Sequence, residues 1–182
     1  MKIEEKYRQG LKKLMKTTPL DEINVVMLSN AIKSNRQTFY YHYRDLSDVI
    51  ESIFLKERIG YGTKTLDFEN IIKPLIAYIN SNFSFLFAVS SSFAEGNLLN
   101  FMYSYFSQKT TQYFKTTKKE ESINQSQLTC AIRYISSLFS SEIVFWISSK
   151  RKERQTHLQK RLTLLWNYII DVYPKEMEAI KW

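Results

Sequence analysis

Helical spacing of apolar residues is the feature that most restricts the fold of this chain. In the first fifteen residues, for example, Ile3, Tyr7, Leu11 and Leu14 recur three or four positions apart, which places them on one face of an α-helix. The spacing continues with few interruptions, because the 182 residues include only four Gly and three Pro. The strict alternation that predicts strands is absent from the sequence, so we expect an all-α fold.

The N-terminal part predicts a series of short helices. Pro19 ends the first helix, because it disfavours helical angles in the residue before it. Asn24 is a good N-cap for the second helix, and Asp45 for the fourth. The predicted helices cover residues 3–15, 25–32 and 36–43, followed by a fourth that begins after Asp45. Together they form a small unit, which we place at residues 1–46.

The remainder of the chain predicts longer amphipathic helices. They cover residues 69–90, 93–115, 123–149 and 154–172, and the polar run 116–121 is the best loop between them. We therefore expect a second domain, over residues 47–182, that is a larger helical bundle.

Composition indicates the chemical class of the binding partners and the cellular compartment. The net charge of +8 favours anionic partners such as nucleic acid. Residues 1–50 hold nine Lys and Arg against six Asp and Glu, so the excess is spread and does not locate a site. The single cysteine, Cys130, the lack of a signal-peptide pattern and the lack of a long apolar run predict a cytoplasmic protein without a membrane span.

Residues 24–42 have the pattern of a helix-turn-helix: a two-turn helix, a tight polar turn and a short helix with a polar and aromatic outer face. In this motif the second helix enters the major groove of DNA. A helical wheel places Phe39 and Tyr43 inside, and for Tyr41 core packing and DNA contact are equally favoured. The side chains that we expect to face DNA are Arg36, Gln37, Thr38, Tyr40 and Tyr41.

The run Asn-Arg-Gln-Thr-Phe-Tyr-Tyr-His-Tyr over residues 35–43 resembles the recognition helix of TetR-family transcriptional regulators, and it also resembles the branch that includes the activator of dihydroxyacetone kinase genes. The resemblance covers residues 4–58. It implies that the five side chains above lie in the major groove, with His42 and the helix start at Asn24 on phosphates. Lys33 departs from the family by standing where glycine or asparagine is usual, which costs strain if its backbone is left-handed.

The resemblance also implies a homodimer that binds a palindromic double-stranded operator, with the last two helices joining the subunits. The dimer residues that we predict are Phe139, Ile143, Trp146, Leu162, Trp166 and Ile169, with packing inside one subunit as the alternative. In relatives the aromatic region 71–114 encloses a small-molecule effector. The effector residues that we predict are Phe83, Phe87, Tyr103 and Phe106, again with core packing as the alternative.

Other functions find little support in the sequence. It lacks a glycine-rich phosphate loop, a Cys-x-x-Cys pair and a nucleophile elbow, so we expect no enzyme, no catalytic residues and no cofactor. Cys130 and His157 have no spacing that suggests a metal site. We expect a repressor that an unidentified effector releases from DNA. The alternative is a helical protein-interaction module whose helix-turn-helix no longer binds an operator.

Overall fold

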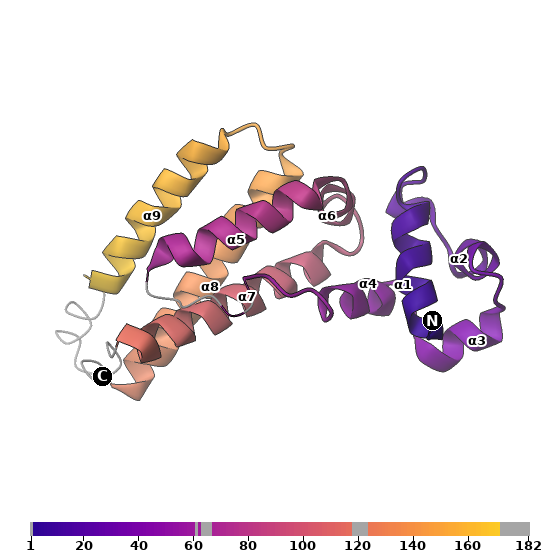
Figure 1. The fold of residues 1–182 in the computed structure, drawn as a ribbon, viewed down its shortest axis with the longest axis horizontal. Coiled ribbons are helices and arrows are strands. Elements are labelled where there is room, and N and C mark those ends of the chain that lie inside the picture. Colours follow the sequence, from indigo (N-terminus) through magenta and orange to yellow (C-terminus); the bar gives the residue numbers. More distant parts are fainter. Residues whose placement is uncertain (1, 61, 63–66, 118–123, 172–182) are drawn as a thin grey trace. The chain divides into compact units, whose positions relative to one another are not determined.

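The computed structural model of the protein describes residues 2–60, 62, 67–117 and 124–171 (Figure 1). All regular structure in these residues is helical, which confirms the predicted fold class. The elements are α1 (Ile3–Leu14), the 3-10 helix η1 (Leu20–Glu22), α2 (Val25–Ala31), α3 (Arg36–His42), α4 (Leu46–Phe54), α5 (Phe68–Ser81), α6 (Phe83–Ser90), α7 (Glu95–Thr117), α8 (Gln125–Ser148) and α9 (Gln155–Asp171).

Most predicted helices agree with these bounds within a few residues. The exception is the segment 69–90, which the structure divides at Asn82 into α5 and α6. Part of the predicted loop 116–121, and the end of the last predicted helix at residue 172, lie outside the described residues.

The chain forms two compact units. Unit 1 comprises Met1–Arg58 and Asn82–Phe101, and unit 2 comprises Ile59–Ser81 and Met102–Trp182. Unit 1 therefore contains the helix-turn-helix together with α6 and the start of α7. The functional boundary that we placed after residue 46 stays a prediction.

The core of unit 1 is built around α1, which contacts both α2 and α4 (Figure 1). Tyr7 and Leu11 on α1 are fully buried, and so is Leu28 on α2. Gly10 allows the close approach of α1 to α2, because a Cβ atom there would overlap the Ile32 side chain. The local amphipathic pattern thus produces the compact support that a helix-turn-helix needs.

Contacts distant in sequence attach the segment 82–101 to the rest of unit 1. The rings of Phe54 on α4 and Phe101 on α7 stack with their centroids 4.5 Å apart. Lys12 forms an ion pair with Glu57 at 3.0 Å and lies 5.0 Å from the centroid of the Phe85 ring on α6. These contacts make α6 a structural part of the unit that carries the helix-turn-helix.

Unit 2 has an aromatic core. Phe68 on α5 lies 5.3 Å from Phe139 on α8 and 5.1 Å from Trp166 on α9, between ring centroids. Tyr113 on α7 adds an edge contact to Trp166 at 5.0 Å. Rings from four helices thus meet in one cluster, which fixes α7, α8 and α9 around α5.

Helix α8 begins with a reciprocal capping box between Asn124 and Gln127. By length and composition alone, α8 could cross a membrane. Half of its most apolar stretch of 18 residues, however, is buried inside the structure. Core helices of soluble proteins can have the same length and composition.

Ion pairs hold α9 against α8. Arg161 of α9 bonds to Glu142, near the C-terminal end of α8, at 2.5 Å, and to Glu153 at 2.8 Å.

Candidate nucleic-acid interface

The turn between α2 and α3 is defined by local hydrogen bonds. The Asn24 side chain caps α2 by accepting from the Met27 N–H at 3.0 Å. At the other end of α2, the Ser34 N–H donates to the Ser29 carbonyl at 2.8 Å. Lys33 lies between Ser29 and Ser34 and has a left-handed backbone conformation, with a φ of 56°. The sequence had indicated this position as the one where a non-glycine residue would be strained, and the structure confirms its left-handed conformation.

The start of α3 is fixed by Asn35. Its side-chain oxygen accepts from the Thr38 N–H at 2.8 Å and from the Thr38 hydroxyl at 3.1 Å. The Tyr7 hydroxyl lies 3.0 Å from the Ser34 hydroxyl, which ties the turn to α1. These bonds give α3 a defined entry angle and leave its first turn at the surface of unit 1.

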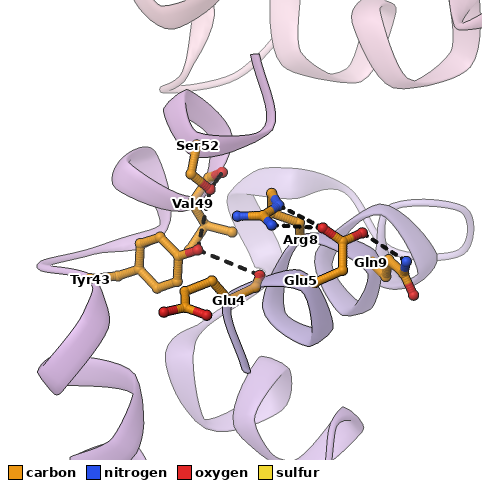
Figure 2. A network of polar contacts seen from close by, with 7 residues as sticks. All are labelled: Glu4, Glu5, Arg8, Gln9, Tyr43, Val49 and Ser52. Atoms are coloured by element: carbon orange, nitrogen blue, oxygen red, sulfur yellow. Dashed lines mark hydrogen bonds and ion pairs between the residues drawn. The ribbon is translucent and has the colours of Figure 1, made fainter. Parts of the chain in front are cut away.

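The inner face of α3 is apolar and anchored. Phe39 is fully buried, and its ring meets the edge of the Tyr7 ring at 5.4 Å. Figure 2 shows how Tyr43 ends the helix: its hydroxyl donates to the Glu4 carbonyl at 3.5 Å and lies 3.3 Å from the Ser52 hydroxyl. Tyr43 therefore connects the C-terminal end of α3 to both α1 and α4, and Phe39 and Tyr43 lie inside as the helical wheel predicted.

The outer face of α3 carries the predicted DNA-facing side chains. Arg36, Gln37, Tyr40 and Tyr41 are exposed, and Thr38 is half-buried with its hydroxyl engaged by the Asn35 cap. The sequence left Tyr41 divided between core and surface, and the structure places it outside with 86% of its surface exposed. A helix with one buried aromatic face and one exposed face of hydrogen-bonding groups has the form that a major groove accepts.

His42 lies in a different setting from these four. Its Nδ1 atom is 3.3 Å from the Glu4 carboxylate, and only 19% of its side chain is exposed. Glu4 thus links the end of α3 to α1 through both its backbone carbonyl and its side chain. The predicted phosphate contact of His42 stays a prediction.

Several ion pairs surround this part of unit 1. Glu5 bonds to Arg8 at 2.6 Å and accepts from Gln9 at 2.7 Å (Figure 2). The Asp48 carboxylate bonds to Arg44 at 2.8 Å, and these hydrogen bonds lower the pKa of Asp48. Neutralised pairs of this kind contribute little net charge, so the cationic groups of the turn and of α3 weigh more in the local field.

A hollow beside the N-terminal ends of α2 and α4 was not expected from the sequence. It has a volume of about 380 Å³ and opens to solvent. Both helix caps, Asn24 and Asp45, line it together with the exposed ring of Phe93. The backbone N–H of Phe93 donates to Asp21 at 3.0 Å. No local signal could have identified Phe93, because it reaches this place only through the packing of the segment 82–101.

The predicted effector residues are divided between the two units. Phe83 and Phe87 belong to α6 in unit 1, where their rings stack at 5.9 Å. Tyr103 and Phe106 belong to the part of α7 in unit 2, and Phe106 is fully buried against Phe139 at 5.5 Å. Phe106 thus packs in the core of unit 2, and the effector role of the four residues stays a prediction.

Most of the residues predicted for the dimer interface are buried within the protomer. Phe139, Ile143, Trp146, Leu162 and Trp166 lie in the core of unit 2 with at most 2% of their surface exposed. A side chain without exposed surface in one subunit is not available to a second, so these five residues pack inside the protomer. Ile169 alone is half-buried. The exposed apolar residues of α8 and α9 are instead Tyr134, Leu138, Phe145, Leu164 and Tyr168.

Comparison with known proteins identifies the family. A TetR-type family model described as "Transcriptional regulator C-terminal region" matches residues 67–168, which is more than half of the chain. The chain belongs to the TetR family of transcriptional regulators. The match lies outside the helix-turn-helix, so it supports the assignment independently of the recognition-helix pattern.

A solved structure agrees with this membership of the TetR family. The protein described as "Dihydroxyacetone kinase operon activator DhaS" has the same fold, with a TM-score of 0.63 and 17% sequence identity over 94% of this chain and 96% of that one. No curated protein sequence matches the chain. As a TetR-family member it is a DNA-binding transcriptional regulator and not an enzyme.

The described part of the chain contains no group of three or more His, Cys, Asp or Glu side chains that could hold a metal ion.

Proposed function

We propose that the protein is a cytoplasmic homodimeric repressor that binds a palindromic DNA site through α3 and leaves it when a small molecule binds. The observation that carries the proposal is the division of α3 into two faces. Phe39 and Tyr43 hold the helix to unit 1, while the side chains of Arg36, Gln37 and Tyr41 are exposed. Exposed groups of these types suit guanine, adenine and phosphate.

The helix ends add support for DNA binding. The first turns of α2 and α3 consist of exposed and half-buried residues, and each offers backbone N–H groups that the Asn24 and Asn35 caps satisfy only in part. Such ends bind phosphate oxygens well, because their free N–H groups and the helix dipole both favour an anion. Contacts of this kind fix the register of a protein on DNA, and the side chains of α3 then select the sequence.

The dimer proposal rests on exposed apolar side chains of α8 and α9. Leu138 and Phe145 are seven residues apart on α8, and Leu164 and Tyr168 are four apart on α9, so each pair shares one face of its helix. Phe145 has 70% of its surface exposed, although its neighbours Val144 and Trp146 are buried. Two subunits that cover these faces would present two copies of α3 to a palindrome.

A binding experiment tests the DNA proposal. Duplexes selected from a random-sequence pool should enrich a palindrome, and fluorescence anisotropy should show affinity that falls steeply with salt. Arg36→Ala should weaken binding to the selected site more than binding to random duplex. Arg44→Ala is the matched control, because Arg44 is exposed outside α3 and paired with Asp48. A pool without enrichment would favour the alternative, a protein-interaction module.

A second experiment tests the dimer. Phe145→Glu should convert a dimer of the full chain into a monomer in sedimentation equilibrium, because it places charge in an apolar contact. Leu55→Glu, at an exposed apolar residue of unit 1, should leave the dimer intact. A monomeric wild-type protein contradicts the proposal.

The direction of regulation needs a reporter. Placing the selected site over a promoter should lower expression in the presence of the protein, and deleting the gene should restore it. The reverse result would make this protein an activator, as the structural neighbour DhaS is described to be.

A further inference from the structure

The interior of unit 2 contains a positive charge that the packing does not explain. Lys109 on α7 has only 6% of its surface exposed. Its ammonium donates to the Gly60 carbonyl at 3.2 Å, and no carboxylate of the described residues forms an ion pair with it. An ammonium has three N–H donors, and a buried charge with a single neutral partner is costly. Burial also lowers the pKa of Lys109.

A neighbouring hydroxyl is in a similar position. Thr110 is fully buried, and its Oγ1 atom has no hydrogen-bond partner in the described part of the protein. Other threonines of α7 do not behave in this way, since Thr111 donates to the Ser107 carbonyl at 2.8 Å and Thr117 to the Tyr113 carbonyl at 2.8 Å. Among the described residues, Thr110 thus has a hydroxyl without a hydrogen-bond partner, and Lys109, which precedes it in the chain, has an ammonium without a carboxylate partner.

These two polar groups lie on an aromatic face. Lys109 and Thr110 each lie three or four positions from both Phe106 and Tyr113, so the four residues share the inner face of α7. Phe106 contacts the Phe139 ring at 5.5 Å, and Tyr113 contacts the Trp166 ring at 5.0 Å. On this face the two polar groups lie between aromatic residues that belong to the core cluster of unit 2.

We propose that Lys109 and Thr110 form the polar anchor of a binding site in unit 2 for a small aromatic carboxylate. The carboxylate would accept hydrogen bonds from the ammonium and from the hydroxyl, and its ring would contact the aromatic side chains beside them. Rearrangement of the aromatic cluster around the bound ring would be the first consequence of binding. This inference rests on the proposed function, because it specifies the class of the effector that releases the protein from DNA.

Thermal unfolding of the full-length protein tests the site. The probes are benzoate and phenylacetate, compared with benzamide and phenylacetamide at the same concentration and ionic strength. The amides keep the ring and lose the charge. We expect at least one acid to raise the Tm of the wild-type protein while its amide does not, since a ligand that binds only the folded state stabilises it. Equal responses to acids and amides, or no response to either acid, overturn the proposal.

Variants assign the effect to the two residues. Lys109→Met should abolish the difference between acid and amide, and should raise the Tm of the ligand-free protein by about 2–4 °C, because it removes a buried charge that pairs with no carboxylate of the described residues. Lys115→Met is the matched control on the exposed side of the same helix, and should change neither quantity. A response to the acids that survives Lys109→Met, or a variant with a lowered Tm, contradicts the assignment.

Thr110→Val should weaken the response to the acids several-fold while keeping the side-chain volume. Thr111→Val, which removes a hydroxyl already bonded within the helix, should leave that response unchanged. If both variants respond equally, Thr110 does not contact the ligand and the two-residue anchor is wrong.

DNA binding separates this inference from the proposed function. If the wild-type protein binds its selected DNA but shows no acid-specific stabilisation, the inference fails and the regulator stands. If the acids stabilise the protein and Lys109→Met abolishes the effect, but no DNA sequence is selected, the inference stands and the proposed function fails.

Discussion

Replacing Lys33 with glycine should stabilise unit 1. Lys33 has a φ of 56° in the turn between α2 and α3, where the Ser34 N–H bonds back to the Ser29 carbonyl. A residue with a Cβ atom loses about 1–2 kcal/mol in this region. Glycine avoids that cost but loses about 0.5–1 kcal/mol through the greater freedom of the unfolded chain. The difference between the midpoints of the two ranges predicts a gain of about 0.75 kcal/mol.

The measurement is urea unfolding followed by circular dichroism, with thermal unfolding beside it. For a chain of this size the gain corresponds to a rise in Tm of about 1–4 °C. Lys6→Gly is the matched control, because Lys6 is exposed in the body of α1 and the same exchange should there lower stability by about 0.5–1 kcal/mol. If Lys33→Gly is no more stable than the wild type, strain at this turn does not limit the stability of the motif.

Three further predictions concern unit 1. Asn35→Ala should cost about 1 kcal/mol and weaken DNA binding, because α3 loses its cap, whereas Asn35→Ser should restore most of the stability; unchanged urea unfolding would refute the role of the cap. Gly10→Ala should lower stability by about 1–3 kcal/mol, since its Cβ overlaps Ile32 despite the better helix propensity of alanine, and a rise in Tm would contradict this. Arg44 lowers the pKa of Asp48, so the stability that this pair contributes is fully present above the unfolded pKa of about 3.9 and is lost as the pH falls through the lower folded pKa. Asp48→Asn should therefore lose less stability than the wild type on acidification, measured by urea unfolding at each pH. Identical dependence of stability on pH in the two proteins would contradict this.

The short helices of unit 1 were predictable because their signals are local. Asn24, Asn35 and Asp45 each cap the helix that follows, and each does so through a side chain within three residues of its partner. Of the two tyrosines at the end of α3, Tyr43 was assigned to the core by helical angle alone. A recognition helix of two turns is thus specified by nearby residues, whatever the rest of the chain does.

The organisation of the longer helices was less predictable. The break at Asn82 was not predictable, because no glycine or proline stands beside it and the apolar pattern continues on both sides. The membership of α6 in unit 1 depends on contacts such as that between Phe54 and Phe85, which are distant in sequence.

The burial of most of the predicted dimer residues has a related reason. Apolar side chains occur around most of α8, so the broadest stripe in the sequence, which includes Phe139 and Ile143, is the one that the core takes. The surface residue Phe145 differs from these two only in its angle around the helix. A single sequence gives no measure of which apolar face meets the core and which meets a partner.

Guanine methylation protection on the selected DNA tests the central claim most directly, because it reports contact with the N7 atom in the major groove. The account predicts two clusters of protected guanines in successive major grooves, about one helical turn apart or a multiple of it, and weaker protection at the guanines nearest α3 in Arg36→Ala. Tight binding without major-groove protection, or a pattern that Arg36→Ala leaves unchanged, would show that the exposed face of α3 does not read DNA.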